Sequence, residues 1–134
     1  MLFVIQRGLN GVETVPPSDI IYCVTSLDYV RDAGFDFIFS NGHAVSDLTN
    51  FFGPEKVGEI RSLLDWDAIK AKYWKNEKDL DLKRRKEAEF LLWGDLPATG
   101  IEGLIAYDET AREQIFQMKS YNGQRVRVRP DYYF

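Results

Sequence analysis

Residues 83–93 are Lys83-Arg84-Arg85-Lys86-Glu87-Ala88-Glu89-Phe90-Leu91-Leu92-Trp93. Four consecutive cations lead into two glutamates and then into an apolar run that predicts a strand over 88–93. A carboxylate at the start of a strand is held on rigid backbone, where it can stabilise a developing positive charge. Cations beside it can bind phosphates. The segment therefore suggests a nucleotide or nucleic-acid substrate.

A plainer interpretation fits the same residues, namely a charged helix over 81–87 that ends before a core strand. Taken alone, the residues favour this solvated charge run. Glu87 and Glu89 share a face if the strand begins that early, and such a pair can do acid–base work or simply face water. His43, the only histidine, lies in the turn Asn41-Gly42-His43, where a surface or hydrogen-bonding role is commoner than catalysis.

The composition is that of a folded protein, with 134 residues, 45% hydrophobic and 28% charged. We expect a single domain with its own core. The net charge of -4 argues against a protein that coats nucleic acid without regard to sequence. It leaves room for local basic surfaces, and two cationic clusters are present, one at 83–86 and one formed by Arg125, Arg127 and Arg129.

Cys23 is the only cysteine and lies in the apolar run 20–24, which predicts a buried structural thiol and no disulfide within the chain. The first residues carry neither a positive region nor a long apolar stretch, so we expect no signal peptide and no membrane span. A reducing cytoplasm fits this cysteine usage.

The chain predicts an α+β fold, with strands separated from helices along the sequence. The expected strands are 2–6, 20–24, 36–40, 88–93, 103–107 and 124–129, with 20–24 buried on both faces. The expected helices are 26–33, 54–64, one after Asp65 or Asp67, 81–87 and 108–119 with Met118 inward. Residues 45–86 show broken helical patterns, which predict a helical insertion long enough to form a substrate-facing lid.

Sequence motifs for common cofactors are absent, including HExxH, CxxC, the P-loop and GxGxxG. We therefore expect no metal. Acidic residues for a metal-dependent nuclease exist, but their spacing is not diagnostic. These are Asp36, Asp47, Asp65 and Glu89.

Residues 83–91 resemble the DarT family of DNA ADP-ribosyltransferase toxins. Other segments agree with the family in order along the chain. They are Met1–Ile5, Ile20–Val24, Phe39–Ala44, Asp65-Trp66, Pro97–Tyr107 and Tyr133-Phe134. The resemblance spans essentially the whole chain and corresponds to the C-terminal two-thirds of the family.

The resemblance implies an ADP-ribosyltransferase-like split β-sheet that clasps NAD, with the helical insertion placed before the strand of the catalytic glutamate. It implies transfer of ADP-ribose from NAD to a base of single-stranded DNA. Glu89 matches the catalytic glutamate, which would also hold the nicotinamide ribose of NAD. Lys83, Arg84 and Arg85 would then contact DNA phosphates, and His43 would lie near the DNA. The family resemblance also implies a toxin whose partner is a macrodomain antitoxin.

One feature of the family has no counterpart in this sequence. The family carries an N-terminal part with a histidine-bearing NAD-binding strand and a catalytic arginine, and Arg7 and Arg31 do not match that arginine. We therefore expect a truncated copy, a start-site error, or a relative that lost its chemistry. The alternative functions are an inactive module that binds DNA or protein and, third, a metal-dependent nuclease. An incomplete sheet edge would also allow a homo-oligomer.

Overall fold

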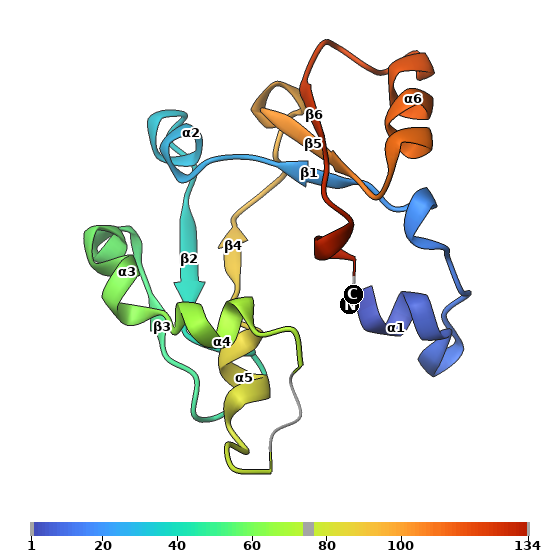
Figure 1. The fold of residues 1–134 in the computed structure, drawn as a ribbon. Helices are drawn as coiled ribbons and strands as arrows, with labels where there is room; N and C mark the ends of the chain where they lie inside the picture. The colour runs from blue at the N-terminus through green and yellow to red at the C-terminus, as the bar shows by residue number, and fades with distance from the viewer. Residues whose placement is uncertain (1, 74–76, 134) are drawn as a thin grey trace. The chain divides into compact units, whose positions relative to one another are not determined.

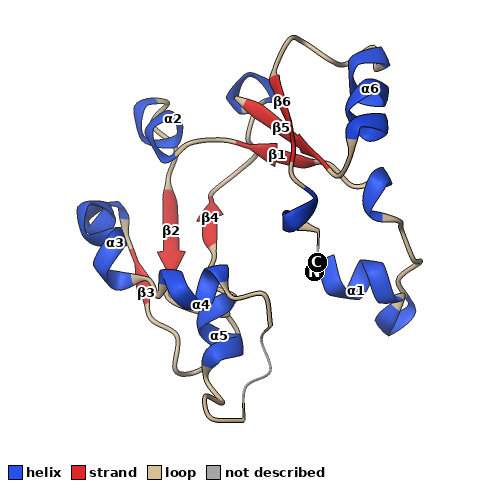
Figure 2. Cartoon of the chain, viewed as in Figure 1, coloured by secondary structure: helices blue, strands red, loops and turns tan. Residues whose placement is uncertain are grey.

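The computed structural model describes residues 2–73 and 77–133 and divides the chain into two compact units (Figure 1). The terminal unit consists of Met1–Ala33 and Leu96–Phe134, and the central unit consists of Gly34–Asp95. Among the described residues, each unit contains a three-stranded sheet with helices from its own part of the chain (Figure 2). The prediction of a single domain stays a prediction.

The sheet of the terminal unit has the strand order β1-β5-β6. β1 (Tyr22–Val24) pairs antiparallel with β5 (Gly103–Ala106), which pairs parallel with β6 (Arg125–Val128). The parallel pair is joined by helix α6 (Glu109–Gln117), which begins where the Asp108 side chain accepts a hydrogen bond from the Ala111 N–H at 2.8 Å. The buried core between this helix and the sheet contains Ala106, Ala111 and Ile115.

Short helical segments and the C-terminal tail complete the terminal unit. They are α1 (Leu2–Arg7), η1 (Leu9–Gly11), η2 (Pro17–Asp19), α2 (Leu27–Asp32), η4 (Ala98–Gly100) and η5 (Pro130–Tyr132). The tail is anchored by Tyr133, which is buried. Its hydroxyl donates to the Ile105 carbonyl at 2.6 Å and lies 3.0 Å from that of Ile20.

The central unit is built on a second sheet, of strand order β3-β2-β4, in which both pairings are antiparallel. The strands are β2 (Phe37–Ser40), β3 (Phe51–Phe52) and β4 (Phe90–Leu92). The connection from β3 to β4 holds η3 (Pro54–Glu59), α3 (Ile60–Leu63), α4 (Trp66–Lys70) and α5 (Leu82–Lys86). This arrangement agrees with the predicted helical insertion before the strand that follows Glu89.

Two strand predictions were wrong in the terminal unit. Residues 2–6 are helical, because a short apolar run does not distinguish strand from helix. The helix stops at Gly8, which has a left-handed φ of 63°. β1 is not buried on both faces, because Cys23 and Val24 are exposed. Among the described residues it forms the edge of the sheet, next to β5.

Smaller differences concern where elements end. Met118 is exposed because α6 ends at Gln117, one residue before it. β4 begins at Phe90, two residues later than predicted, and the two-residue strand β3 was not predicted. No helix in the described ranges 2–73 and 77–133 is long and apolar enough to cross a membrane.

Replacing Tyr133 by phenylalanine should lower the free energy of unfolding by about 1–3 kcal/mol, because two carbonyl groups lose the hydroxyl beside them. Urea denaturation followed by circular dichroism measures this. Tyr73→Phe is the matched control, since Tyr73 is exposed, and it should leave the free energy of unfolding unchanged. A Tyr133→Phe variant as stable as the parent protein would contradict the anchoring role of the tail.

Candidate active site

Glu89 directly precedes β4 and is half-buried. Both of its main-chain polar groups are bonded to Ser40, the last residue of β2. The Ser40 N–H donates to the Glu89 carbonyl oxygen at 2.9 Å, and the Glu89 N–H donates to the Ser40 hydroxyl oxygen at 3.1 Å. The carboxylate therefore extends from backbone whose N–H and C=O are both held by Ser40, as a charge-stabilising group requires.

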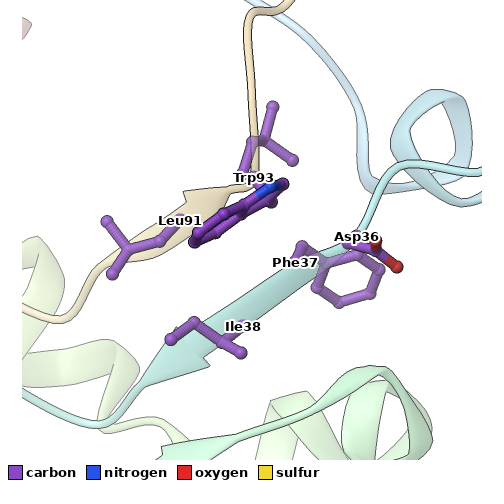
Figure 3. Close-up of a pocket in the computed structure, with 6 residues that line it drawn as sticks. Asp36, Phe37, Ile38, Leu91 and Trp93 are labelled. Atoms are coloured by element: carbon purple, nitrogen blue, oxygen red, sulfur yellow. The ribbon is translucent and has the colours of Figure 1, made fainter.

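A concavity of about 470 Å³ lies on the paired strands β2 and β4. It is lined by Asp36, Phe37, Ile38, Leu91, Leu92 and Trp93. Figure 3 labels five of these side chains, on β2 and β4 or directly beside them. The pairing extends one step beyond the strands, since the Trp93 N–H donates to the Asp36 carbonyl at 2.9 Å. Side chains alternate along a strand, so Glu89 belongs to the face of Leu91 and Trp93. Glu89 itself does not line this concavity.

Arg84 connects helix α5 to the turn that carries His43. The Arg84 carbonyl accepts a hydrogen bond from the His43 N–H at 2.9 Å. Its guanidinium binds both carboxylate oxygens of Asp81, at 2.7 and 2.8 Å, and reaches the Asn41 carbonyl at 3.4 Å. With only 16% of its side chain exposed, Arg84 is part of the packing between helix and turn.

Arg85 is surrounded by three carboxylates. Its nitrogens lie 2.9 Å from Asp65, 2.7 Å from Asp79 and 3.0 Å from Asp81. Asp65 also caps α4 by accepting from the Ala68 N–H, and that bond, together with Arg85, lowers the pKa of Asp65. Hydrogen bonds from Arg84 and Arg85 lower the pKa of Asp81 to about 2. The ion pairs thus join α4 to the start of α5.

Lys86 continues this pattern at the other end of α4. Its ammonium donates to the carbonyl oxygens of Ile69 and Ala71, at 3.2 and 2.5 Å, and burial lowers its pKa. Lysine near a helix C-terminus satisfies carbonyl groups that the helix leaves open. Within the run 83–86, Lys83 is the residue with an exposed side chain.

The structure brings some of the predicted site residues together, whereas others make contacts that were not predicted. His43 is half-buried in the turn held by Arg84, and its Nδ1 accepts from the Val45 N–H at 3.4 Å. Arg84 and Arg85, predicted as phosphate contacts, already bind aspartates, so their contact with DNA stays a prediction. Ser40 was not predicted as a site residue. The sequence feature that could have indicated it is a hydroxyl side chain at the end of an apolar strand.

Glu87 does not form a pair with Glu89 along the strand. The strand begins only at Phe90, and the Glu87 N–H donates to the Lys83 and Arg84 carbonyls at the end of α5. The condition for the two glutamates to share a strand face is therefore not met. No group of three or more histidine, cysteine or acidic residues within the described ranges is placed to hold a metal ion.

Comparison with known proteins identifies the family. The sequence model described as ssDNA thymidine ADP-ribosyltransferase, DarT, matches residues 1–134. The chain belongs to the DarT family. Because this match runs over the whole chain, it gives no support to the expectation that only a C-terminal part of the family's domain is present.

Curated members of the DarT family are similar over most of the chain. A DNA ADP-ribosyl transferase of Thermus sp. (strain 2.9) is 32% identical over 100% of this chain and 63% of its own length. One from Escherichia coli O127:H6 (strain E2348/69 / EPEC) is 30% identical over 87% of this chain and 53% of its own. The chain thus spans between half and two-thirds of the length of these relatives.

Solved DarT structures have the same fold. Thermus sp. 2.9 DarT in complex with ADP-ribosylated ssDNA superimposes with a TM-score of 0.82 at 29% identity, covering 99% of this chain and 63% of that one. The complex of the same protein with NAD+ gives a TM-score of 0.77, with 99% and 66% covered. The predicted α+β, ADP-ribosyltransferase-like fold is confirmed.

Replacing Gly42 by alanine should destabilise the turn that carries His43. A Cβ at position 42 would lie 3.0 Å from the Arg84 carbonyl oxygen and 2.5 Å from its Nη1, so the helix and the turn must separate. We expect a loss of about 1–3 kcal/mol in the free energy of unfolding, measured by urea denaturation. Gly58→Ala is the control, because a Cβ there meets nothing within 4 Å. Equal stability of the two variants would contradict this close packing.

Replacing Asp81 by asparagine should remove part of the acid sensitivity of the fold. The folded-state pKa of Asp81, about 2, lies below its ordinary value of 3.8, so its ion pairs stabilise the fold above pH about 4 and are lost as the pH falls toward about 2. The stability difference between parent and Asp81→Asn, measured by denaturation at several pH values, should therefore shrink over that range. Asp47→Asn, at an exposed position, should show no such trend.

Proposed function

We propose that the protein is an NAD-dependent ADP-ribosyltransferase that modifies a base in single-stranded DNA, with Glu89 as the catalytic carboxylate. The main observation is the double attachment of the Glu89 backbone to Ser40 at the start of β4. Support also comes from relatives named DNA ADP-ribosyl transferase and from the complexes of Thermus sp. 2.9 DarT with NAD+ and with ADP-ribosylated ssDNA. The family description names thymidine, which we take as the target nucleoside.

In this proposal Glu89 acts on charge in the transition state. The bond between the nicotinamide nitrogen and ribose C1′ breaks, and its electron pair leaves with nicotinamide. The ribose then gains oxocarbenium character, which the fixed carboxylate of Glu89 stabilises. A nucleophilic atom of the base bonds to C1′, and the base releases its proton to solvent.

On the DNA side, we assign the first phosphate contact to Lys83, because its side chain is exposed on α5. Arg84 and Arg85 can reach a phosphate only by giving up aspartate partners, so their main role in this proposal is to hold α5. His43 is the proposed neighbour of the strand in the turn beside them. These four residues lie in the same unit as Glu89.

We also propose that the protein acts as a toxin and that a macrodomain antitoxin removes the modification. The support is the family resemblance, which implies a toxin with a macrodomain antitoxin as its partner. Incubating modified oligonucleotide with a macrodomain hydrolase should restore the original mass. A modification that resists such hydrolases would contradict the partnership.

Replacing Glu89 by glutamine should abolish transfer while the domain stays folded. Mass spectrometry of a thymidine-containing oligonucleotide incubated with NAD should show addition of one ADP-ribosyl group with the parent protein. The rate should fall by at least about 100-fold with Glu89→Gln, because the developing charge loses its counter-charge. Glu113→Gln, on the exposed side of α6, is the control and should keep the parent rate. Full activity of Glu89→Gln would refute the assignment.

A second candidate is a catalytically inactive module that binds single-stranded DNA or a protein. The observation that favours it is that Glu89 does not line the concavity on β2 and β4. Calorimetry with NAD distinguishes the two candidates. Measurable binding of NAD supports the enzyme. Binding of an oligonucleotide with no binding of NAD at millimolar concentration supports the inactive binding module.

A further inference from the structure

We propose that Ser40 is the positioning residue of the Glu89 carboxylate, an inference that rests on the proposed function. Among the described residues, Ser40 is the buried polar side chain of the central unit, with no exposed surface at all. It ends a strand whose Phe37 and Phe39 form the apolar packing. Burying a hydroxyl inside a protein is unfavourable unless it is fully hydrogen-bonded. The hydrogen bonds of the Ser40 hydroxyl therefore indicate its structural role.

Both hydrogen-bonding functions of the hydroxyl are used. The Ser40 hydroxyl donates to the Gly42 carbonyl at 2.7 Å and accepts from the Glu89 N–H at 3.1 Å. In a regular antiparallel ladder the Glu89 N–H would find the main-chain carbonyl of the facing residue. Here the side chain takes that place, at the point where the chain leaves β2 for the turn. The Glu89 amide thus depends on a side chain that can be removed by mutation.

The same hydroxyl also connects Glu89 to the turn with His43. Gly42 lies in that turn, and the next residue donates its N–H to the Arg84 carbonyl. Ser40 therefore sets the distance between the two parts of the proposed site, the carboxylate and the turn on the DNA side. A shift of about 1 Å in such a group reduces catalysis by about 100-fold even when binding survives.

A purely structural role for Ser40 makes a different prediction. If the hydroxyl only satisfied the backbone, its loss would lower the unfolding midpoint and leave kcat unchanged at temperatures where the protein is folded. If it positions Glu89, kcat falls in folded protein while the KM for NAD changes little. The two roles are thus separated by kinetics and not by stability.

The test compares Ser40→Ala, Ser40→Thr and Ser62→Ala, each assayed well below its own unfolding midpoint. We expect Ser40→Ala to lower kcat by about 10- to 100-fold with the KM for NAD within about twofold. Ser40→Thr keeps the hydroxyl and should recover most of kcat. Ser62→Ala removes an exposed hydroxyl that donates to the Glu59 carbonyl at 2.9 Å, and it should have the parent kcat. A parent-like kcat for folded Ser40→Ala overturns the proposal.

Amide hydrogen exchange tests the positioning without any activity. In Ser40→Ala the Glu89 amide should exchange at least about tenfold faster, while the Ile38 and Leu91 amides, in the neighbouring strand register, keep their protection. Unchanged protection at Glu89 overturns the inference. Should Ser40→Ala not fold, Ser40→Cys, of similar size but with a weak hydrogen bond, takes its place with the same expectations.

The parent protein and Glu89→Gln show which of the two proposals fails. If the parent transfers no ADP-ribose, or if Glu89→Gln remains active, the proposed function is wrong and Ser40 has no catalytic group to position. If the parent is active, Glu89→Gln is inactive and Ser40→Ala is fully active, only the role of Ser40 is wrong. Loss of kcat in Ser40→Ala together with faster exchange at Glu89 supports both.

Discussion

The contact between Ser40 and Glu89 is the constraint on which the central unit depends. These residues are separated by 49 positions, and the insertion between them must bring the chain back to the same place. Two hydrogen bonds join them: the Ser40 N–H donates to the Glu89 carbonyl, and the Ser40 hydroxyl accepts from the Glu89 N–H.

The basic run that precedes Glu89 illustrates how charge in a sequence differs from charge on a surface. Helix α5 turns Arg84, Arg85 and Lys86 toward carboxylates and helix ends of the insertion, and partly buried cations require such partners. Lys83 alone in this run has an exposed side chain. Much of the positive charge that suggested DNA binding therefore holds α4 against α5. This packing restrains the segment that leads into Glu89.

The fold by itself does not establish the chemistry, because one fold can support many functions. Family membership and the likeness to DarT structures support the proposal of ADP-ribosyl transfer, a reaction that would need a fixed anion in the site. We propose Glu89 for that role because its backbone is held by Ser40. The concavity on β2 and β4 adds an apolar surface in the same unit. Binding of NAD and of DNA by this chain are proposals that experiments can test.

Local sequence determined the α+β class, most strand positions and two helix starts, because caps such as Ser26 and Asp108 act on residues three positions away. For α4 the sequence left Asp65 and Asp67 as alternative caps, and the structure shows that Asp65 caps the helix. The ordered segments also determined the family. Only tertiary structure decided that Cys23 is exposed, that Arg85 binds three aspartates and that Ser40 holds Glu89. The physical reason is distance along the chain, since β1 is an edge strand only once the sheet has formed, and the partners of Arg85 and Ser40 lie up to 20 and 49 residues away.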